Sequence, residues 1–364
     1  MRPKSIRAAW LVGPAVIVAT AAACAPMPPA PAPLINLTKT ANGESFDPSI
    51  SDNGRFVVFS SDATNLVAND TNGRTDVFLA DRNNRKVRNL TASGDGDSLG
   101  GVISGDGKFV AFYSAATNLT ADADNGQLDV FKLDLTTSAV TNLTPLGDEF
   151  SGFPSISDNG AVVAFQSYAS NVTLGGDTDG GLADIFTNAS GATVQLTGAG
   201  DFFDQPTVTG NGATVGFQAY GAFGGTQDEP RVVTVGAVAG TPSAEGSYAG
   251  ELSLSDSGLV PAFRTFTSPE GVIQVGASVV SNPATAATDP ALSDDGTKVV
   301  YTVGDNVVIT AVGGATANVA AGNGPSGEAA VNGNGKVVAF TSYATNLGVT
   351  DGNGAVGDIY VRKL

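Results

Sequence analysis

Four loops of this chain carry aspartate and asparagine at spacings that could hold a divalent cation. In each loop, oxygen-bearing side chains alternate, a glycine follows, and a further aspartate precedes a run of apolar residues. Alternating oxygen ligands with a glycine bend are typical of the first half of a calcium-binding loop. The candidate ligands are Asp70, Asn72 and Asp76; Asp122, Asp124 and Asp129; Asp177, Asp179 and Asp184; and Asp351, Asn353 and Asp358.

The same loops can be explained without a metal. They lack the bidentate glutamate that ends such a site, and the distance to the last aspartate varies from loop to loop. Asp and Asn side chains also accept hydrogen bonds from nearby backbone amides in Asx turns, which need no cation. Two interpretations therefore stay open: Ca²⁺ as the one candidate cofactor, or Asx turns that only shape the loops.

The chain lacks the residues on which many hydrolases and metalloenzymes depend. It contains no histidine and a single cysteine, Cys24. Ser-His-Asp and Cys-His catalysis are therefore excluded, as are zinc, iron and copper sites with histidine ligands. Catalysis by paired carboxylates stays open, as in glycosidases.

The aspartate loops recur because the chain is built from repeats. Each repeat has a short apolar segment, a glycine turn, a strand-like run, the aspartate loop and further strand-like runs. The clearest copies are Ser45–Thr91, Ser98–Thr144, Ser151–Thr197 and Gly327–Leu364. Apolar and polar residues that alternate at a period of two, rich in Val, Phe and Thr, indicate β-strands. A period of roughly fifty residues with several strands predicts an all-β fold, a β-propeller.

The turn glycines predict the number of blades. They are Gly54, Gly107, Gly160, Gly212, Gly258, Gly296 and Gly335. These turns predict seven blades; because units four to six are degenerate, six blades with an irregular insertion is the alternative. The last unit lacks a fourth strand, and residues 34–38 match the fourth strand of the first unit, Val87–Thr91. We therefore expect residues 34–38 to pair with the last blade, which closes the ring and removes exposed sheet edges.

The start of the chain predicts export. Residues 1–23 have basic residues and then a short, alanine-rich apolar run, as a signal peptide does. Cys24 follows three alanines, where a bacterial lipoprotein carries its lipidated cysteine, although Ala21 stands where leucine is usual. Residues 24–33 comprise this cysteine, the last residue of a lipobox (the lipoprotein-processing motif), and a proline-rich spacer. Residues 34–364 form the propeller domain. We expect a membrane lipoprotein that faces outward or into the periplasm, with free secretion as the alternative.

Charge narrows the class of partner. The net charge is −17 at neutral pH, and such an acidic protein repels the phosphate backbone of nucleic acids. We therefore expect no nucleic-acid partner, membrane contact only through the lipid on Cys24, and a monomer.

One face of the predicted propeller should collect the binding residues. In a four-stranded blade, the loop between the second and third strands shares a face with the connection to the next blade. These connections carry carboxylates and phenylalanines, and loop-rich faces commonly bind partners. The candidate binding residues are Asp148, Phe150, Asp201, Phe202, Phe203 and Asp204.

The repeat resembles that of the TolB-type propellers. Residues 48–61, followed by Asp76–Leu79, have the form of that repeat, with Ser-Asp-Asn-Gly at 51–54 where the family has Ser-Pro-Asp-Gly. The likeness extends over residues 34–364 and is clearest in units one, two, three and seven. It implies a periplasmic or cell-surface propeller that acts through protein–protein contacts. The additional N-terminal domain of TolB has no counterpart here, so its partners do not carry over.

Two functions remain after these exclusions. The first is a non-catalytic scaffold, in the cell envelope or outside the cell, that recognises a protein or a wall polysaccharide through the acidic loop face. The alternative is a carbohydrate-active enzyme, a lyase or glycosidase, that uses carboxylates on the same face. The lack of histidine favours the first, as does the position of Trp10, the single tryptophan, within the leader. We therefore expect no enzymatic activity and assign no catalytic residue.

Overall fold

The computed structural model describes residues 33–364 with internal gaps. The residues left out within this range are 69, 122–125, 174–180, 199–201, 221–228, 235–248, 259, 266–270 and 283–284. Pro33–Leu364 form one compact unit, and every regular element described in it is a β-strand. Nothing in the described part of the chain is a helix long and apolar enough to cross a bilayer. The predicted signal peptide, Cys24 and the rest of the spacer up to residue 32 lie outside the described residues.

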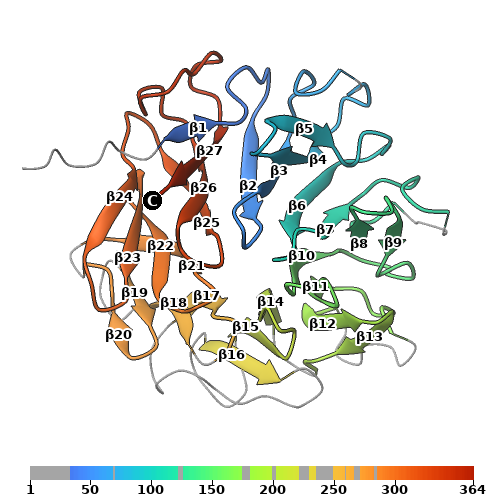
Figure 1. The fold of residues 1–364 in the computed structure, drawn as a ribbon. Helices are drawn as coiled ribbons and strands as arrows, with labels where there is room; N and C mark the ends of the chain where they lie inside the picture. Colours follow the sequence, from blue (N-terminus) through green and yellow to red (C-terminus); the bar gives the residue numbers. More distant parts are fainter. Residues whose placement is uncertain are drawn as a thin grey trace, which may run out of the picture. The chain divides into compact units, whose positions relative to one another are not determined.

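Within the described residues, the strands form seven antiparallel sheets around a central axis (Figure 1). Each sheet is one blade, and blades are numbered here in chain order of their innermost strands. The innermost strands are β2 (Ser45–Ile50), β6 (Ser98–Ile103), β10 (Ser151–Ile156), β14 (Phe202–Val208), β17 (Ala249–Leu254), β21 (Ala287–Leu292) and β25 (Ser326–Val331). The second strands are β3 (Phe56–Ser61), β7 (Phe109–Ser114), β11 (Val162–Ser167), β15 (Thr214–Tyr220), β18 (Pro261–Thr265), β22 (Lys298–Val303) and β26 (Val337–Ser342).

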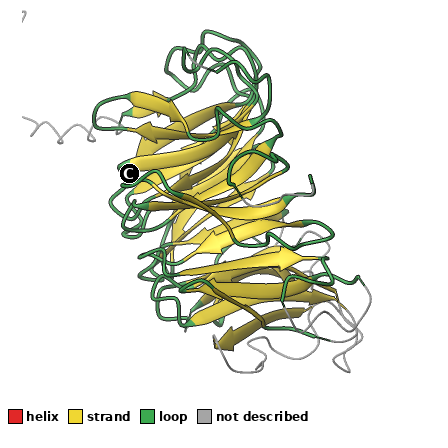
Figure 2. Cartoon of the chain, turned by 90° about the vertical axis from the view of Figure 1, so that its right-hand side faces the viewer, coloured by secondary structure: helices red, strands yellow, loops and turns green. Residues whose placement is uncertain are grey.

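The outer half of each blade completes the sheet. The third strands are β4 (Asp76–Asp81), β8 (Asp129–Asp134), β12 (Asp184–Ala189), β16 (Glu229–Thr234), β19 (Val272–Val275), β23 (Asn306–Ala311) and β27 (Asp358–Lys363). The fourth strands are β5 (Lys86–Asn89), β9 (Val140–Asn142), β13 (Ala192–Gln195), β20 (Ser278–Val279), β24 (Thr316–Ala320) and, in the last blade, β1 (Leu34–Asn36). In the side view, loops gather at the strand ends, on the two faces of the ring (Figure 2).

The core lies between neighbouring blades, which cover both faces of the second and third strands. β3 and β4 are therefore buried along almost their whole length, which explains why their central residues are all apolar rather than alternately apolar and polar. A stacked aromatic pair recurs between the second and third strands of blades one, two, three and seven. The pairs are Phe59–Phe78 (5.7 Å between ring centroids), Phe112–Phe131 (5.6 Å), Phe165–Phe186 (5.7 Å) and Phe340–Tyr360 (5.6 Å).

The N-terminal strand closes the ring as predicted. β1 pairs antiparallel with β27, with Ile35 opposite Val361. Thr38 Oγ1 donates a hydrogen bond of 2.6 Å to the buried carboxylate of Asp358. The all-β propeller fold and its closure by residues 34–38 are therefore confirmed. Of the two blade counts left open, the strand pairing supports seven, because units four to six each form a sheet of their own.

Candidate binding site at the channel mouth

Each innermost strand carries one residue with a left-handed backbone at the same position of the repeat. The seven are Asp47 (φ 51°), Gly100 (59°), Phe153 (49°), Gln205 (50°), Glu251 (55°), Asp289 (53°) and Glu328 (48°). A shift in register follows at this position of every innermost strand. We call these seven residues the bulge ring. A left-handed backbone costs a residue other than glycine roughly 1–2 kcal/mol, and a β-bulge re-aims its side chain.

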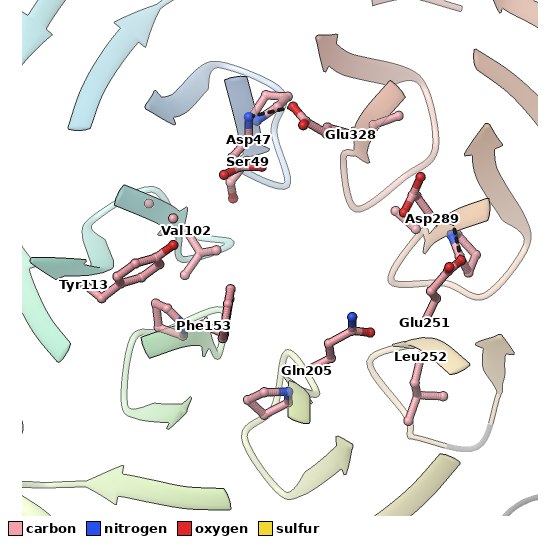
Figure 3. Close-up of a pocket in the computed structure, with 18 residues that line it drawn as sticks. Asp47, Ser49, Val102, Tyr113, Phe153, Gln205, Glu251, Leu252, Asp289 and Glu328 are labelled. Carbon is pink, nitrogen blue, oxygen red and sulfur yellow. Dashed lines mark hydrogen bonds between the residues drawn. The ribbon is translucent and has the colours of Figure 1, made fainter. Parts of the chain in front are cut away.

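The bulge ring lines a cavity of about 470 Å³ at the centre of the propeller (Figure 3). The bulge ring lies near the start of each innermost strand. The cavity therefore opens toward the face that carries the aspartate loops, and we call it the channel mouth. The backbone conformation of the bulge repeats around the axis, whereas the residue type at this position differs between blades. Side-chain chemistry therefore gives the cavity two different walls.

The first wall is acidic and comes from four consecutive blades. We call Glu251, Asp289, Glu328 and Asp47, from blades five, six, seven and one, the acidic arc (Figure 3). Glu328 Oε2 accepts hydrogen bonds from the backbone N of Asp47 (3.0 Å) and from Thr341 Oγ1 (2.7 Å). Glu251 repeats this arrangement, because its carboxylate accepts from the backbone N of Asp289 (2.7 Å) and pairs with Arg264 (3.1 Å). Each glutamate thus holds the strained bulge of the next blade.

The acidic arc raises the affinity of its own members for protons. Partial burial, and then the neighbouring charge of Glu328, raises the pKa of Asp47 to about 6. Burial also raises the pKa of Glu251, and the charge of Asp289 acts in the same direction. Asp47, Asp289 and Glu328 are nevertheless exposed within the channel, so a ligand can reach them.

The second wall is aromatic and comes from blades two and three, where Tyr113 and Phe153 line the cavity and Phe150 packs against both rings. Phe153 is 51 % exposed although its ring packs 5.7 Å from Tyr113 and 5.6 Å from Phe150. Tyr113 requires the glycine at position 100, since a Cβ there would lie 3.0 Å from its Cδ1 and even closer to its Cε1. We call Tyr113, Phe150 and Phe153 the aromatic arc. Gln205 stands beside it in the bulge ring (Figure 3).

The predicted binding-face residues fall into different surroundings. Phe150 belongs to the aromatic arc, and Phe202 is half-buried with its ring 5.9 Å from that of Tyr168. Asp148 is exposed, and its carboxylate accepts hydrogen bonds from the backbone N (2.9 Å) and Oγ (2.8 Å) of Ser170. Asp204 is half-buried in β14, and Asp201 lies outside the described residues.

The assignment of Phe203 to the binding face was wrong. Its side chain is fully buried and packs in the core of blades three and four, with its ring 5.5 Å from that of Phe217. Two adjacent residues of a strand point to opposite faces, so Phe202 and Phe203 cannot both face a partner. Sequence reasoning also missed the bulge ring. Its one local signal is the proline that follows the bulge residue in blades one, three, four and six.

The last aspartate of each predicted calcium loop is a hydrogen-bond acceptor within its blade. Its carboxylate receives an amide N–H and a threonine O–H from an Asn-x-Thr or Gln-x-Thr segment of the fourth strand. Asp76 accepts from Asn89 (2.8 Å) and Thr91 (2.6 Å), Asp129 from Asn142 (2.9 Å) and Thr144 (2.7 Å), Asp184 from Gln195 (2.7 Å) and Thr197, and Asp358 from Asn36 (2.7 Å) and Thr38 (2.6 Å).

The rest of these loops offers few free ligands. Asn72 and Asn353 direct their Nδ2 atoms toward the carboxylates of Asp76 and Asp358 (both 3.2 Å), and Asp351 Oδ1 accepts two backbone N–H groups. Asp70 Oδ1 is buried without a hydrogen-bond partner among the described residues. The remaining candidates, Asp122, Asp124, Asp177 and Asp179, lie outside those residues. Where the structure describes the chain, no group of three acidic side chains has a metal-site arrangement.

The hydrogen bonds predict how Asp76 acts. Replacing Asp76 by Asn should place its new N–H₂ against the Asn89 donor and lower the free energy of unfolding by about 1–3 kcal/mol. We expect the same loss of melting temperature in EDTA and in millimolar CaCl₂. The exposed Asp305 supplies the control, Asp305→Asn, with no change. A loss confined to calcium-containing buffer would show instead that Asp76 is a calcium ligand.

Four aspartates form a second acidic cluster at the opposite end of the channel. The turns that follow the innermost strands hydrogen-bond to one another around the axis; Asp158 N, for example, donates to Gly210 O (2.9 Å) and Asp294 N to Gly333 O (3.1 Å). A Cβ at Gly210 would overlap carboxylate oxygens of both Asp158 and Asp256. We call Asp52, Asp158, Asp256 and Asp294 the aspartate ring.

Burial raises the pKa of every member of the aspartate ring, and repulsion by neighbouring aspartates adds to this effect at Asp52, Asp158 and Asp294. Burial, and then the charges of Asp52 and Asp256, raises the pKa of Asp158 to about 6. The same two causes raise the pKa of Asp294 to about 8, and Asp294 and Asp52 share a hydrogen bond. The aspartate ring therefore retains protons at a pH at which isolated aspartates are ionised.

Comparison with solved structures identifies the fold. An oligogalacturonate lyase from Vibrio parahaemolyticus is 13 % identical, with 91 % of this chain and 93 % of that chain covered and a TM-score of 0.62. The β-propeller domain of the Trilobed protease from Pyrococcus furiosus is 11 % identical, with 88 % and 95 % covered and a TM-score of 0.60. TolB from Acinetobacter baumannii is 16 % identical, with 67 % and 51 % covered and a TM-score of 0.43.

The similarities to the lyase and to the protease domain, with TM-scores of 0.62 and 0.60, place the chain in the β-propeller fold, and a fold does not by itself determine a function. No protein-family model matches the sequence, and no curated protein matches it.

Proposed function

We propose that this chain is an exported, non-catalytic binding protein that takes a segment of a partner protein into the channel mouth. The observation that supports this most is Phe153, an aromatic residue held in a strained conformation with about half of its surface exposed to a central cavity. Exposed aromatic anchors in a preformed pocket are typical centres of binding energy, and backbone strain concentrates at functional sites. The leader and Cys24 support export and a lipid anchor.

Charge favours this proposal over a lyase that cleaves acidic polysaccharides. The acidic arc would repel the carboxylates of a polyuronate, because Arg264 pairs with Glu251 alone and no lysine or arginine is among the residues that line the cavity. The chain also has no histidine for a metal site. A neutral or basic ligand suits the cavity better.

Phe153 offers a test that separates binding from folding. Phe153→Gly removes the ring and also relieves the left-handed strain, since glycine adopts this conformation readily. We expect the melting temperature to change by no more than a few degrees, and capture of the partner from cross-linked envelope extracts to fall at least tenfold. Val279→Ala, at an exposed residue of β20, is the control and should capture as well as the wild type. Equal capture by Phe153→Gly would contradict the proposal.

A second candidate function rests on Asp47 and Glu328. A carboxyl group with a pKa of about 6 next to a second carboxyl group, that of Glu328, resembles the acid–base pair of a glycosidase. Incubation with neutral glycans, followed by an assay for new reducing ends, distinguishes the two functions. Turnover that Asp47→Asn abolishes would establish the enzyme and overturn the binding protein.

A further inference from the structure

We infer that the channel mouth selects a basic side chain, lysine or arginine, presented by an extended segment of the partner protein. This inference rests on the proposed function and adds the chemical class of the ligand. It comes from the uneven distribution of charge and aromatic rings around the cavity (Figure 3).

The acidic arc has far more negative charge than the protein neutralises. Its four carboxylates come from adjacent blades, and Arg264, which pairs with Glu251, is the one cation seen in an ion pair with them among the described residues. Asp47, Asp289 and Glu328 stay exposed to the channel. At Asp47 the charge of Glu328 adds to the effect of burial and raises the pKa, which is in keeping with carboxylates that lack a counter-charge. A cation from outside would supply it.

The aromatic arc suits the same ligand from the other side. Aromatic faces attract ammonium and guanidinium groups through their quadrupole, by roughly 0.5–2 kcal/mol. Tyr113 and Phe153 also cover the aliphatic stem of a lysine or arginine side chain, which is apolar. The cavity volume of about 470 Å³ lies within the range of pockets that bind small groups. A metal ion fits less well, because the described carboxylates do not cluster in a metal-site arrangement.

A row of rings indicates that the basic side chain belongs to a polypeptide. From Tyr113 in the cavity, the row continues through Phe150 (6.0 Å), Tyr168 (5.9 Å) and Phe202 (5.9 Å), each distance measured to the preceding ring. Phe150, Tyr168 and Phe202 are half-buried. They provide an apolar path over blades two to four for residues that flank the basic one. A free polyamine would leave this path uncovered.

Three labelled peptides test the inference on the full chain. Each is acetylated and amidated, with the sequence Gly-Ser-Leu-X-Leu-Ser-Gly, where X is lysine, norleucine or glutamate. We expect fluorescence anisotropy to show that the lysine peptide binds at least tenfold more tightly than the norleucine peptide. The glutamate peptide should not bind measurably. Raising NaCl from 50 to 500 mM should weaken the binding of the lysine peptide alone, because salt screens charge.

Two double variants localise the effect. Asp47→Asn with Asp289→Asn removes two charges of the acidic arc. This double variant should bind the lysine peptide at least tenfold more weakly than the wild type does, and its affinity for the norleucine peptide should be unchanged. Asp62→Asn with Asp305→Asn removes two exposed charges outside the cavity and should leave both affinities within twofold of the wild type. Equal weakening by the two double variants would overturn the inference, because it would reflect the overall charge of the protein.

The outcomes separate this inference from the proposed function. No measurable binding of the lysine peptide up to millimolar concentration, or equal binding of all three peptides, would overturn the choice of a basic side chain. The proposed function would still stand if capture of the partner depended on Phe153. If Phe153→Gly captured its partner normally, the binding site itself would be wrong, whatever the peptides showed.

Discussion

A chain that lacks residues 34–38 is expected to lose about 5 kcal/mol of stability and to unfold at a melting temperature lower by several degrees or more. The deletion removes β1 from the edge of β27 and takes two donors away from the buried carboxylate of Asp358, those of Asn36 and Thr38. It also uncovers the apolar clusters against which Leu34 and Leu37 pack. Differential scanning calorimetry measures the loss, and an unchanged melting temperature would refute closure by this strand.

A single substitution tests the same closure more gently. Thr38→Val keeps the shape of the side chain but leaves Asp358 with one donor fewer, at a cost of about 1–3 kcal/mol. The exposed neighbour Thr40 provides the control, because Thr40→Val should leave the melting temperature unchanged. If both valine variants melted alike, the hydrogen bond to Asp358 would contribute nothing to closure.

Asp294→Asn is expected to stabilise the protein at pH 9 and to have little effect at pH 4. The folded state raises the pKa of Asp294 from its ordinary value of 3.8 to about 8. Such a shift contributes stability that is fully present below pH 3.8 and is lost as the pH rises through 8. Asparagine removes the charge that causes this loss. Because Asp294 is only partly buried and solvent screens its charge, we expect about 2 kcal/mol, well below the unscreened value.

The wild-type protein should accordingly be most stable in mildly acidic solution. Stability falls above about pH 6 as Asp158 and then Asp294 ionise. It also falls below pH 4, because hydrogen bonds from Thr136 and Ser170 lower the pKa values of Asp134 and Asp148, whose contribution is lost on protonation. Melting temperatures measured from about pH 2 to about pH 9 test this profile. Asp305→Asn should follow the wild-type curve; if it matched Asp294→Asn, the effect would come from net charge rather than from the aspartate ring.

Much of the fold follows from local patterns in the sequence. Short runs rich in Val and Phe mark the strands of each repeat, and the match between residues 34–38 and Val87–Thr91 predicts closure. The sequence also locates the aspartate loops and offers Asx turns, which need no metal, as one of two interpretations. Hydrogen bonds between Asp76 and the Asn89–Thr91 segment explain why Asn-x-Thr recurs at the end of the repeat.

The binding cavity depends on features that sequence patterns do not contain. Residue type does not indicate that Phe153 or Glu328 has a left-handed backbone, since such residues rarely adopt it. The position of Phe203 on the core side of β14 likewise depends on strand register.

The sequence by itself therefore determined the strands, their repeat and the closure of the ring, because these depend on neighbouring residues or on matching segments. The tertiary structure alone decided which side chains meet at the axis. Asp47 and Glu328 are far apart in the chain, yet they stand side by side once β1 has joined β27 and brought blade seven against blade one. The acidic arc, the aromatic arc and the aspartate ring form where the blades converge on one axis, and the pattern of a single repeat does not show which of its side chains reach that axis.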